Sequence, residues 1–175
     1  FKEGFTNYYA LKALHRIGDL NDESFLQILA GLFYQRYVSD DAVGRESITN
    51  GQLKHEHWGL IYSGGLLVAI AQDLQIRSVT GNEKSIDDLM RFMFDEHSDD
   101  PYDLTDIKQK LDKLNNADQA DFFERYVRGV DQIPIAKYLV LAGIETLEEE
   151  GRTVFRISED ADADALEIRS GMFGN

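Results

Sequence analysis

The sequence predicts a mainly α protein: an irregular bundle of six or seven helices around a buried central helix, with a short extended or β tail. Three observations predict this fold class. Only 2 of the 175 residues are proline, so long helices can run without interruption. One stretch, Leu60 to Val79, is apolar on nearly every face, as in a helix that is buried on all sides. β-branched alternation, which is typical of strands, is confined to the C-terminal part of the chain.

Two amphipathic helices are expected at the N-terminal end. The first covers residues 3–16, where apolar side chains recur at helical spacing. The second begins after Asn21, a favourable N-cap residue, and runs to about Val38. Residues 39–57 are polar and contain two glycines, so we expect a long loop there with one short helical turn.

The central helix is expected to end at Gly81, a residue that readily adopts the left-handed conformation of a helix terminus. Ser85 should then cap the following helix, with Asp88 three residues later in an approximate capping box. We expect four apolar residues of that helix to face the core. They are Leu89, Met90, Met93 and Phe94.

Three shorter helices are expected to follow. Thr105 should cap the first of them, DIKQKLDKL. A second begins around Asp118 and ends at Gly129, and a last one lies between Pro134, which interrupts the chain, and Gly143.

We place a boundary near residue 145. Residues 1–144 should form the helical part, and residues 145–175 an acidic linker and β tail that leads to a following domain. Within the tail, the alternation of Thr153, Phe155 and Ile157 predicts a strand or hairpin.

The chain is strongly acidic, with a net charge of −14. Such a charge argues against nucleic acid and against anionic membrane surfaces as partners. The longest apolar run, Leu66 to Ala71, is too short to span a bilayer. The absence of cysteine excludes disulfides and thiolate metal sites. Composition leaves the oligomeric state open, and leaves the compartment open between cytoplasm and periplasm.

The stretch HEHWG, residues 55–59, has the composition of a zinc motif but not its spacing. A zinc-binding helix presents two histidines four residues apart, on one face. His55 and His57 are two apart, so on a helix they point to opposite sides. We interpret them as polar residues that precede the central helix.

The stretch DADAD, residues 160–164, resembles the start of a calcium loop. Such a loop has Gly at its sixth position and Glu at its twelfth. Those positions are Ala165 and Gly171 here, so we interpret the stretch as a solvated acidic linker.

Gly64 and Gly65 lie inside the predicted central helix, where each glycine costs about 1 kcal/mol relative to alanine. Close approach of another helix, or of a substrate backbone, would explain such a pair, and packing is the commoner reason. Glu3 and Tyr62 also have plain structural interpretations. Glu3 is a favourable first-turn carboxylate, and Tyr62 is an aromatic residue of the core.

Three stretches, in this order, resemble the glycyl aminopeptidase family, which are zinc peptidases of the gluzincin group that carry a PDZ domain. KEGFTNYYAL is similar to the family pattern W-x-x-E-G-F-T-D-Y-Y. IYSGGLLVAIAQDLQIRSVTGNEKSIDDLMRFMF is similar to Y-x-K-G-x-L-V-x-x-L-L-D-L-x-I-R followed by S-L-D-D-V-M-R. DFFERYVRGVDQIPIAKYLVLAGIE is similar to D-F-F-x-R-Y-V-x-G-x-x-x-x-P. The resemblance covers residues 1–145.

The resemblance implies that Glu3 is the third protein ligand of a zinc ion. The two histidine ligands and the catalytic glutamate, in an H-E-x-x-H motif, would lie upstream of Phe1. Tyr62 matches the phenol that donates a hydrogen bond to the oxyanion in related enzymes. Gly65 matches the family glycine and Gly64 replaces the family lysine, and we expect both to contact the substrate.

By the same resemblance, the chain would be the C-terminal part of a catalytic domain. The parent protein would be an aminopeptidase that releases small N-terminal residues from peptides, with a PDZ domain downstream. The segment alone should be inactive and should bind no zinc tightly, because one carboxylate is not a zinc site.

Two other readings remain open. One is a non-catalytic helical interaction module with a peptidase-derived fold, and the other is an acidic calcium-responsive domain. An H-E-x-x-H motif about 20–30 residues upstream of Glu3 in the parent sequence would favour the enzyme over the module.

Overall fold

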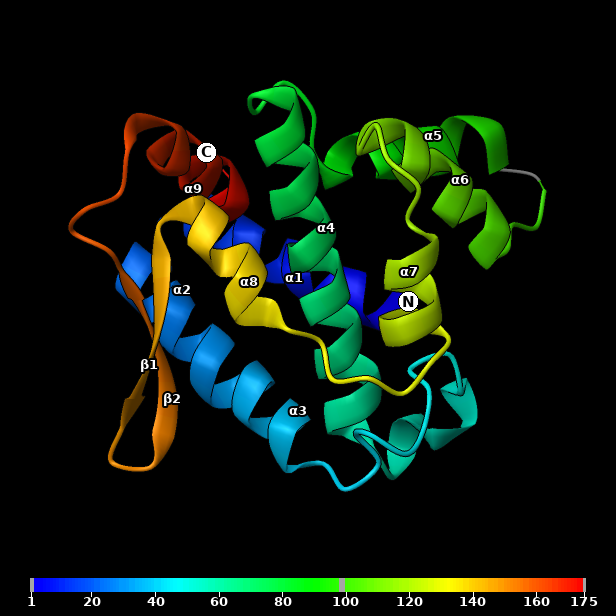
Figure 1. Cartoon of the computed structure of the whole chain (residues 1–175), viewed down its shortest axis with the longest axis horizontal. Helices are drawn as coiled ribbons and strands as arrows, with labels where there is room; N and C mark the ends of the chain where they lie inside the picture. The colour runs from blue at the N-terminus through cyan, green and yellow to red at the C-terminus, as the bar shows by residue number, and fades with distance from the viewer. Residues whose placement is uncertain (1, 98–99, 175) are drawn as a thin grey trace.

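The computed structural model describes residues 2–97 and 100–174. The prediction of a mainly α fold with a short β segment is confirmed, since 65% of the chain is helical and the two strands form one antiparallel sheet. Figure 1 shows helix α4 (Gly64–Thr80) in the middle of the molecule, with the other helices around it at varied angles. Eight helices occur in the described part of the chain, one more than the upper limit of the prediction.

The central helix was predicted correctly. It begins with a π-helical turn, η3 (Gly59–Ser63), and continues without a break into α4. Every residue from Gly64 to Leu74 is buried, and Gly81 ends the helix with a φ of 59°. Among the described residues, the stretch Gly59–Thr80 is long and apolar enough to cross a membrane, but 89% of its apolar window lies inside the protein. Burial in a protein core accounts for that composition.

The two N-terminal helices are also confirmed. The first is α1 (Lys2–Arg16). The second is one continuous helix whose hydrogen-bonding pattern changes along its length; it comprises α2 (Asp22–Ile28), η1 (Leu29–Tyr34) and α3 (Gln35–Ser39). Asn21 caps it, because its side chain accepts a hydrogen bond of 2.8 Å from the backbone N–H of Ser24. The expected loop follows, with one 3₁₀ turn, η2 (Gly51–His55).

Helix α5 (Ile86–His97) begins at the predicted cap. The Ser85 hydroxyl accepts a hydrogen bond from the Asp87 N–H, and the Asp88 carboxylate accepts one from the Ser85 N–H. This reciprocal pair satisfies two backbone donors that the helix itself cannot satisfy.

The predicted core face of α5 is only half right. Leu89 and Met93 are buried, whereas Met90 is 40% exposed and Phe94 is 73% exposed. Residues three and four apart share a helix face, so Ile86, Leu89 and Met93 form one strip and the neighbouring strip is rotated away from it. In the structure the strip of Ile86, Leu89 and Met93 faces the core.

Helix α6 (Leu104–Leu114) begins at Asp103, so the predicted cap at Thr105 is wrong. The Asp103 carboxylate accepts hydrogen bonds from the N–H groups of Thr105 and Asp106, and the Asp106 carboxylate accepts one from the Asp103 N–H. A carboxylate two residues earlier therefore takes the capping role, and Thr105 lies inside the first turn.

Two further helices occupy their predicted positions. They consist of α7 (Ala120–Phe122) with η4 (Phe123–Val127), and α8 (Ile135–Leu139) with η5 (Val140–Ala142). Asp118 supports the start of α7, because its side chain accepts a hydrogen bond from the Ala120 N–H. Gly143 ends the last helix with a φ of 61°.

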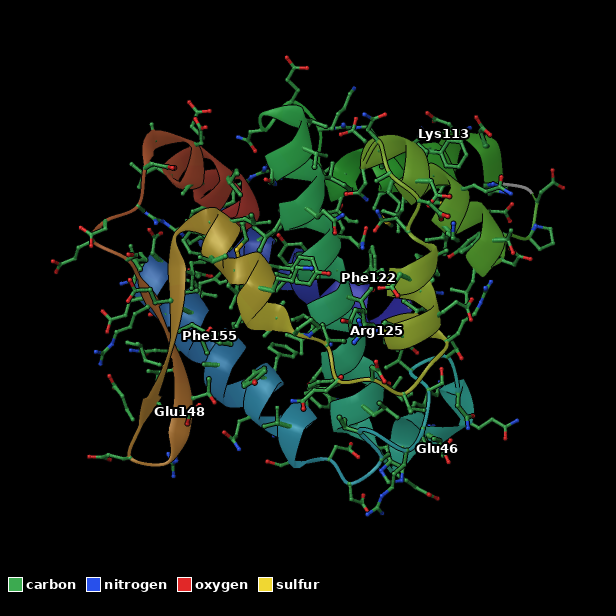
Figure 2. The ribbon with its side chains drawn as sticks, in the orientation of Figure 1. Glu46, Lys113, Phe122, Arg125, Glu148 and Phe155 are labelled. Carbon is green, nitrogen blue, oxygen red and sulfur yellow. The ribbon has the colours of Figure 1, made fainter. Side chains whose placement is uncertain are left out.

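The predicted hairpin is present. Strand β1 (Ile144–Glu149) pairs with strand β2 (Arg152–Ile157) in antiparallel register. Its buried face packs on the second helix, where the rings of Phe155 and Tyr34 lie 5.4 Å apart. Figure 2 shows Phe155 on the strand that borders that helix, with Glu148 in the same hairpin.

The last helix, α9 (Ala163–Phe173), was not predicted. Asp162 of the DADAD stretch is its N-cap and accepts a hydrogen bond from the Ala165 N–H. Met172 and Phe173 are buried in the core, and the Met172 carbonyl accepts a hydrogen bond from the Tyr8 hydroxyl. The DADAD stretch, which was expected to be a solvated acidic linker, instead caps and begins a helix that packs on α1 and α4.

Asp73 of α4 is fully buried and joins three helices and their connections. Its carboxylate accepts hydrogen bonds from the Tyr8 hydroxyl (2.6 Å), the Ile86 N–H (2.9 Å) and the Arg77 Nε (3.1 Å), and the Lys12 Nζ lies 3.9 Å away. The hydrogen-bond donors and the two cations compensate the cost of burying the Asp73 charge. Loss of this carboxylate would leave Arg77 and Lys12 without their buried negative partner.

Candidate functional site

The candidate site is built on the crossing of α1 and the central helix. Gly4 makes this crossing possible, because a Cβ atom added there would lie 2.1 Å from the carbonyl carbon of Gly65 and 2.3 Å from the backbone N of Leu66. A Cβ added at Gly65 would lie 3.2 Å from the Gly4 Cα. The two helix backbones are therefore in direct contact, and the expected close approach of another helix at Gly65 is confirmed.

This crossing places the first turn of α1, which carries Glu3, beside the start of the central helix, which carries Tyr62, although Tyr62 does not line the cavity that borders Glu3. Glu3 is the neighbour of Gly4 in α1, and Tyr62 lies one turn before Gly65 in the central helix. The two residues are separated by 59 positions in the chain, yet each lies within about one helical turn of the same backbone contact. The roles predicted for them, metal ligand and oxyanion donor, remain predictions.

Glu3 lies at the surface of the site rather than in the core. Its side chain is 31% exposed, and its Oε1 lies 3.8 Å from the Nζ of Lys54 in η2. A pair at this distance and exposure is a weak ion pair. The carboxylate lies in the first turn of α1, where the unpaired N–H groups and the helix dipole favour a negative charge.

A cavity of about 320 Å³ opens beside Glu3. Four branched apolar side chains from different segments line it: Ile48 of the loop, Ile61 of η3, Leu104 of α6 and Val127 of η4. Glu3, Lys2 and Lys54 also border it. The cavity thus combines an apolar interior with three charged groups, and most small-molecule sites show the same kind of combination.

Tyr62 is held by an aromatic stack. Its ring lies 5.3 Å from that of Trp58, at an interplanar angle of 7°, and Trp58 in turn lies against Phe33 and under the guanidinium of Arg36. No hydrogen bond from the described residues reaches the Tyr62 hydroxyl. The ring is therefore fixed while its phenol group is free to donate a hydrogen bond to a ligand.

Gly64 and Gly65 are buried between segments of the protein. A Cβ added at Gly64 would lie 3.0 Å from the Ile48 side chain and 3.2 Å from the Tyr37 ring. Packing of the protein on itself accounts for both glycines. Their expected contact with substrate stays a prediction.

A second group of polar side chains lies at the start of the central helix. Asp40, Asp41 and His57 place one ligand atom each within 4.8 Å of the others. The Asp40 carboxylate is already occupied: Oδ1 lies 2.8 Å from the His57 Nδ1 and accepts a hydrogen bond from the Ala42 N–H, and Oδ2 accepts one from the Leu60 N–H at 3.0 Å. Asp40 therefore works as a cap for the central helix, supplied from outside it.

These contacts shift the titration of both partners. Burial opposes the charged form of Asp40, but the N–H donors of Ala42 and Leu60 and the contact with His57 outweigh it, so the pKa of Asp40 lies below its ordinary value. The hydrogen bond to Asp40 raises the pKa of His57. His57 is thus the polar residue before the central helix that the sequence predicted, with a specific partner.

The residues that surround Glu3 were not predicted from the sequence. Lys2 occupies a variable position of the KEGFTNYYAL stretch, Lys54 lies in no motif, and the four apolar residues of the cavity lie far apart in the sequence. Lys54 gave one indication of a site, since it is a cation in a short helical turn of a chain that is otherwise markedly acidic.

Comparison of the chain with protein-family models finds no matching family, and comparison with curated proteins finds no matching relative.

Proposed function

We propose that this chain is the helical C-terminal part of the catalytic domain of a zinc-dependent aminopeptidase, similar to the glycyl aminopeptidases. In this proposal Glu3 is a zinc ligand, Tyr62 donates a hydrogen bond to the oxyanion, and the substrate is a peptide with a small N-terminal residue. The observation that supports the proposal is the backbone contact of Gly4 with Gly65, because it brings together the two helix segments that carry Glu3 and Tyr62 despite their separation in sequence.

The residues present supply one part of a zinc site. Glu3 is a partly exposed carboxylate whose only ion pair in the described chain is the long contact with Lys54. The one group of three ligand residues in the described part, around Asp40, does not include Glu3. Two imidazoles from outside these 175 residues would have to complete the site, as the resemblance implies. We therefore expect the isolated chain to bind zinc weakly and to be inactive.

Glu3 and two imidazoles would hold the zinc ion, which would supply a Lewis acid that acidifies a water and polarises a carbonyl group. In the hydrolysis, a water oxygen would bond to the scissile carbonyl carbon, the C–N bond would break, and a proton from that water would pass to the leaving amine. The Tyr62 hydroxyl would donate its hydrogen bond to the carbonyl oxygen as that oxygen gains negative charge. The stack on Trp58 would hold the ring in place for this role.

The test uses the full-length protein that contains these residues. We expect it to hydrolyse glycyl- and alanyl-p-nitroanilide, and we expect Tyr62→Phe to lower kcat by about 10²–10³-fold, the usual effect of removing one oxyanion donor. Tyr34→Phe is the matched control, since Tyr34 lies against the hairpin and should leave kcat unchanged. Unchanged turnover in Tyr62→Phe would remove this residue from the mechanism. A full-length protein with no peptidase activity would instead support the non-catalytic interaction module.

A further inference from the structure

The cavity beside Glu3 has the size and lining of a binding site for one side chain. Its volume of about 320 Å³ lies at the small end of the range for ligand sites, roughly 300–1,000 Å³. Its interior is formed by Ile48, Ile61, Leu104 and Val127. Thr49 and Gly51 also line the cavity, and the Thr49 hydroxyl already shares a hydrogen bond with that of Ser47. The cavity therefore offers few free hydrogen-bond partners, and its branched apolar side chains favour an apolar occupant.

The charges at the cavity favour an anionic group. Two ammonium groups, those of Lys2 and Lys54, border it, although the chain carries 32 acidic and only 18 basic residues. Lys2 makes no ion pair within the described residues. Lys54 is 39% exposed and its only carboxylate partner there is Glu3, at 3.8 Å. Both lysines could therefore bind a carboxylate without the loss of a strong internal contact.

We propose that this cavity binds the residue that follows the scissile bond of a dipeptide, with its apolar side chain inside and its free carboxylate on Lys54 and Lys2. This inference rests on the proposed function and adds the substrate class, namely dipeptides with a small first residue and a branched apolar second residue. An aminopeptidase site that recognised only the N-terminal residue would need no cation here.

Lys54 lies next to the proposed zinc ligand, since its Nζ is 3.8 Å from the Glu3 Oε1. A dication bound by Glu3 would repel the Lys54 ammonium group. The lysine would then be available for the carboxylate of the substrate.

The first test compares peptides in the full-length protein. We expect Gly-Leu to be hydrolysed with a kcat/KM about ten-fold or more above that of Gly-Leu-amide, which lacks the carboxylate, and above that of Gly-Gly, which lacks the side chain. Lys54→Gln should raise KM for Gly-Leu by about ten-fold, with little change in kcat, and should abolish the preference over the amide. Lys113→Gln is the matched control, because Lys113 is an exposed lysine of α6 that does not border the cavity; Figure 2 shows it far from the loop that carries Glu46.

A binding measurement separates this inference from the proposed function. N-acetyl-leucine and N-acetyl-leucinamide are titrated into the methyl-labelled protein, with the signals of Ile61 and Val127 as the readout. Shifts with the acid, weakened by Lys54→Gln and by the amide, support the cavity assignment even if no peptide is hydrolysed, and in that case only the peptidase proposal fails. Hydrolysis of Gly-Leu with no preference over its amide, or methyl shifts that Lys54→Gln leaves unchanged, overturns the assignment while the peptidase proposal stands.

Discussion

The contact between α1 and the central helix predicts a large effect for one added methyl group, in Gly4→Ala. The new Cβ would lie 2.1 Å from the Gly65 carbonyl carbon, whereas ordinary contacts begin at 3.4 Å. One of the two helices must therefore move by about 1.3 Å, the difference of these two distances. Both contacting atoms belong to the backbone, so no side-chain rotation relieves the overlap.

The magnitude combines two opposing terms. Alanine is favoured over glycine in a helix by about 1 kcal/mol, while overpacking of a rigid site costs about 1–3 kcal/mol and sometimes more. Because the overlap here is with backbone, we expect the upper end of the cost, about 3 kcal/mol, and therefore a net loss of about 2 kcal/mol in the free energy of unfolding. For a chain of this length that loss lowers Tm by about 4–8 °C.

Thermal and urea denaturation, followed by circular dichroism, measure this effect in a graded series. Gly65→Ala should cost less than Gly4→Ala, since its Cβ would lie 3.2 Å from the Gly4 Cα. Gly31→Ala is the control: its Cβ would meet nothing within 4 Å in the exposed part of η1, so it should be neutral or stabilising by up to about 1 kcal/mol. A Gly4→Ala protein as stable as Gly31→Ala would refute the close crossing of the two helix segments that carry Glu3 and Tyr62.

Three other predictions concern the buried and capping residues around the central helix. Asp73→Ala should lower the free energy of unfolding by about 3–5 kcal/mol in urea melts, because Arg77 and Lys12 would lose a buried carboxylate; a loss below about 1 kcal/mol would contradict the buried network. The Asp40 contact raises the pKa of His57, so its contribution to stability is present below the unfolded pKa of about 6.5 and is lost as pH rises through the raised folded value. The Tm difference between wild type and His57→Asn should therefore shrink from about pH 5.5 to about pH 8.5, and a difference that grows would refute the pair. Phe173→Ala should cost about 3–5 kcal/mol while unfolding remains a single transition; separate melting of α9 would show that the C-terminal helix is independent of the core.

Helix positions were predictable where a local signal was strong. The uniformly apolar stretch around Leu66, the cap at Asn21 and the stop at Gly81 each follow from interactions within a few residues, and all three are confirmed. The cap of α6 was misplaced because Asp103 and Thr105 are both good capping residues, and only the backbone path decides between them.

The errors arise where tertiary packing decides. The exposed strip of α5 carries two large apolar side chains, Met90 and Phe94, so the presence of large apolar residues does not by itself show which strip faces the core. Helix α9 was missed because an acidic, glycine-containing stretch is a poor isolated helix, and its stability comes from the burial of Met172 and Phe173.

The candidate site was predictable only in part. Glu3 and Tyr62 came from the resemblance, and the glycines of the central helix correctly indicated a close helix contact. The contact of Gly65 with Gly4 could not be predicted, and neither could the two lysines or the apolar cavity. These features depend on how segments distant in sequence meet. The pair of Asp40 and His57 is of the same kind, since 17 positions separate its members.

The proposed role of Glu3 as a zinc ligand is tested by the zinc content of the full-length protein, measured by elemental analysis after purification and dialysis. We expect about one zinc per chain in the wild type, and a loss of most of that zinc in Glu3→Ala, because zinc sites of this type need all three protein ligands. Glu148→Ala, an exposed carboxylate of the hairpin, should keep its zinc. Full zinc occupancy in Glu3→Ala, or a wild-type protein that binds no zinc, would contradict the proposed zinc site at Glu3.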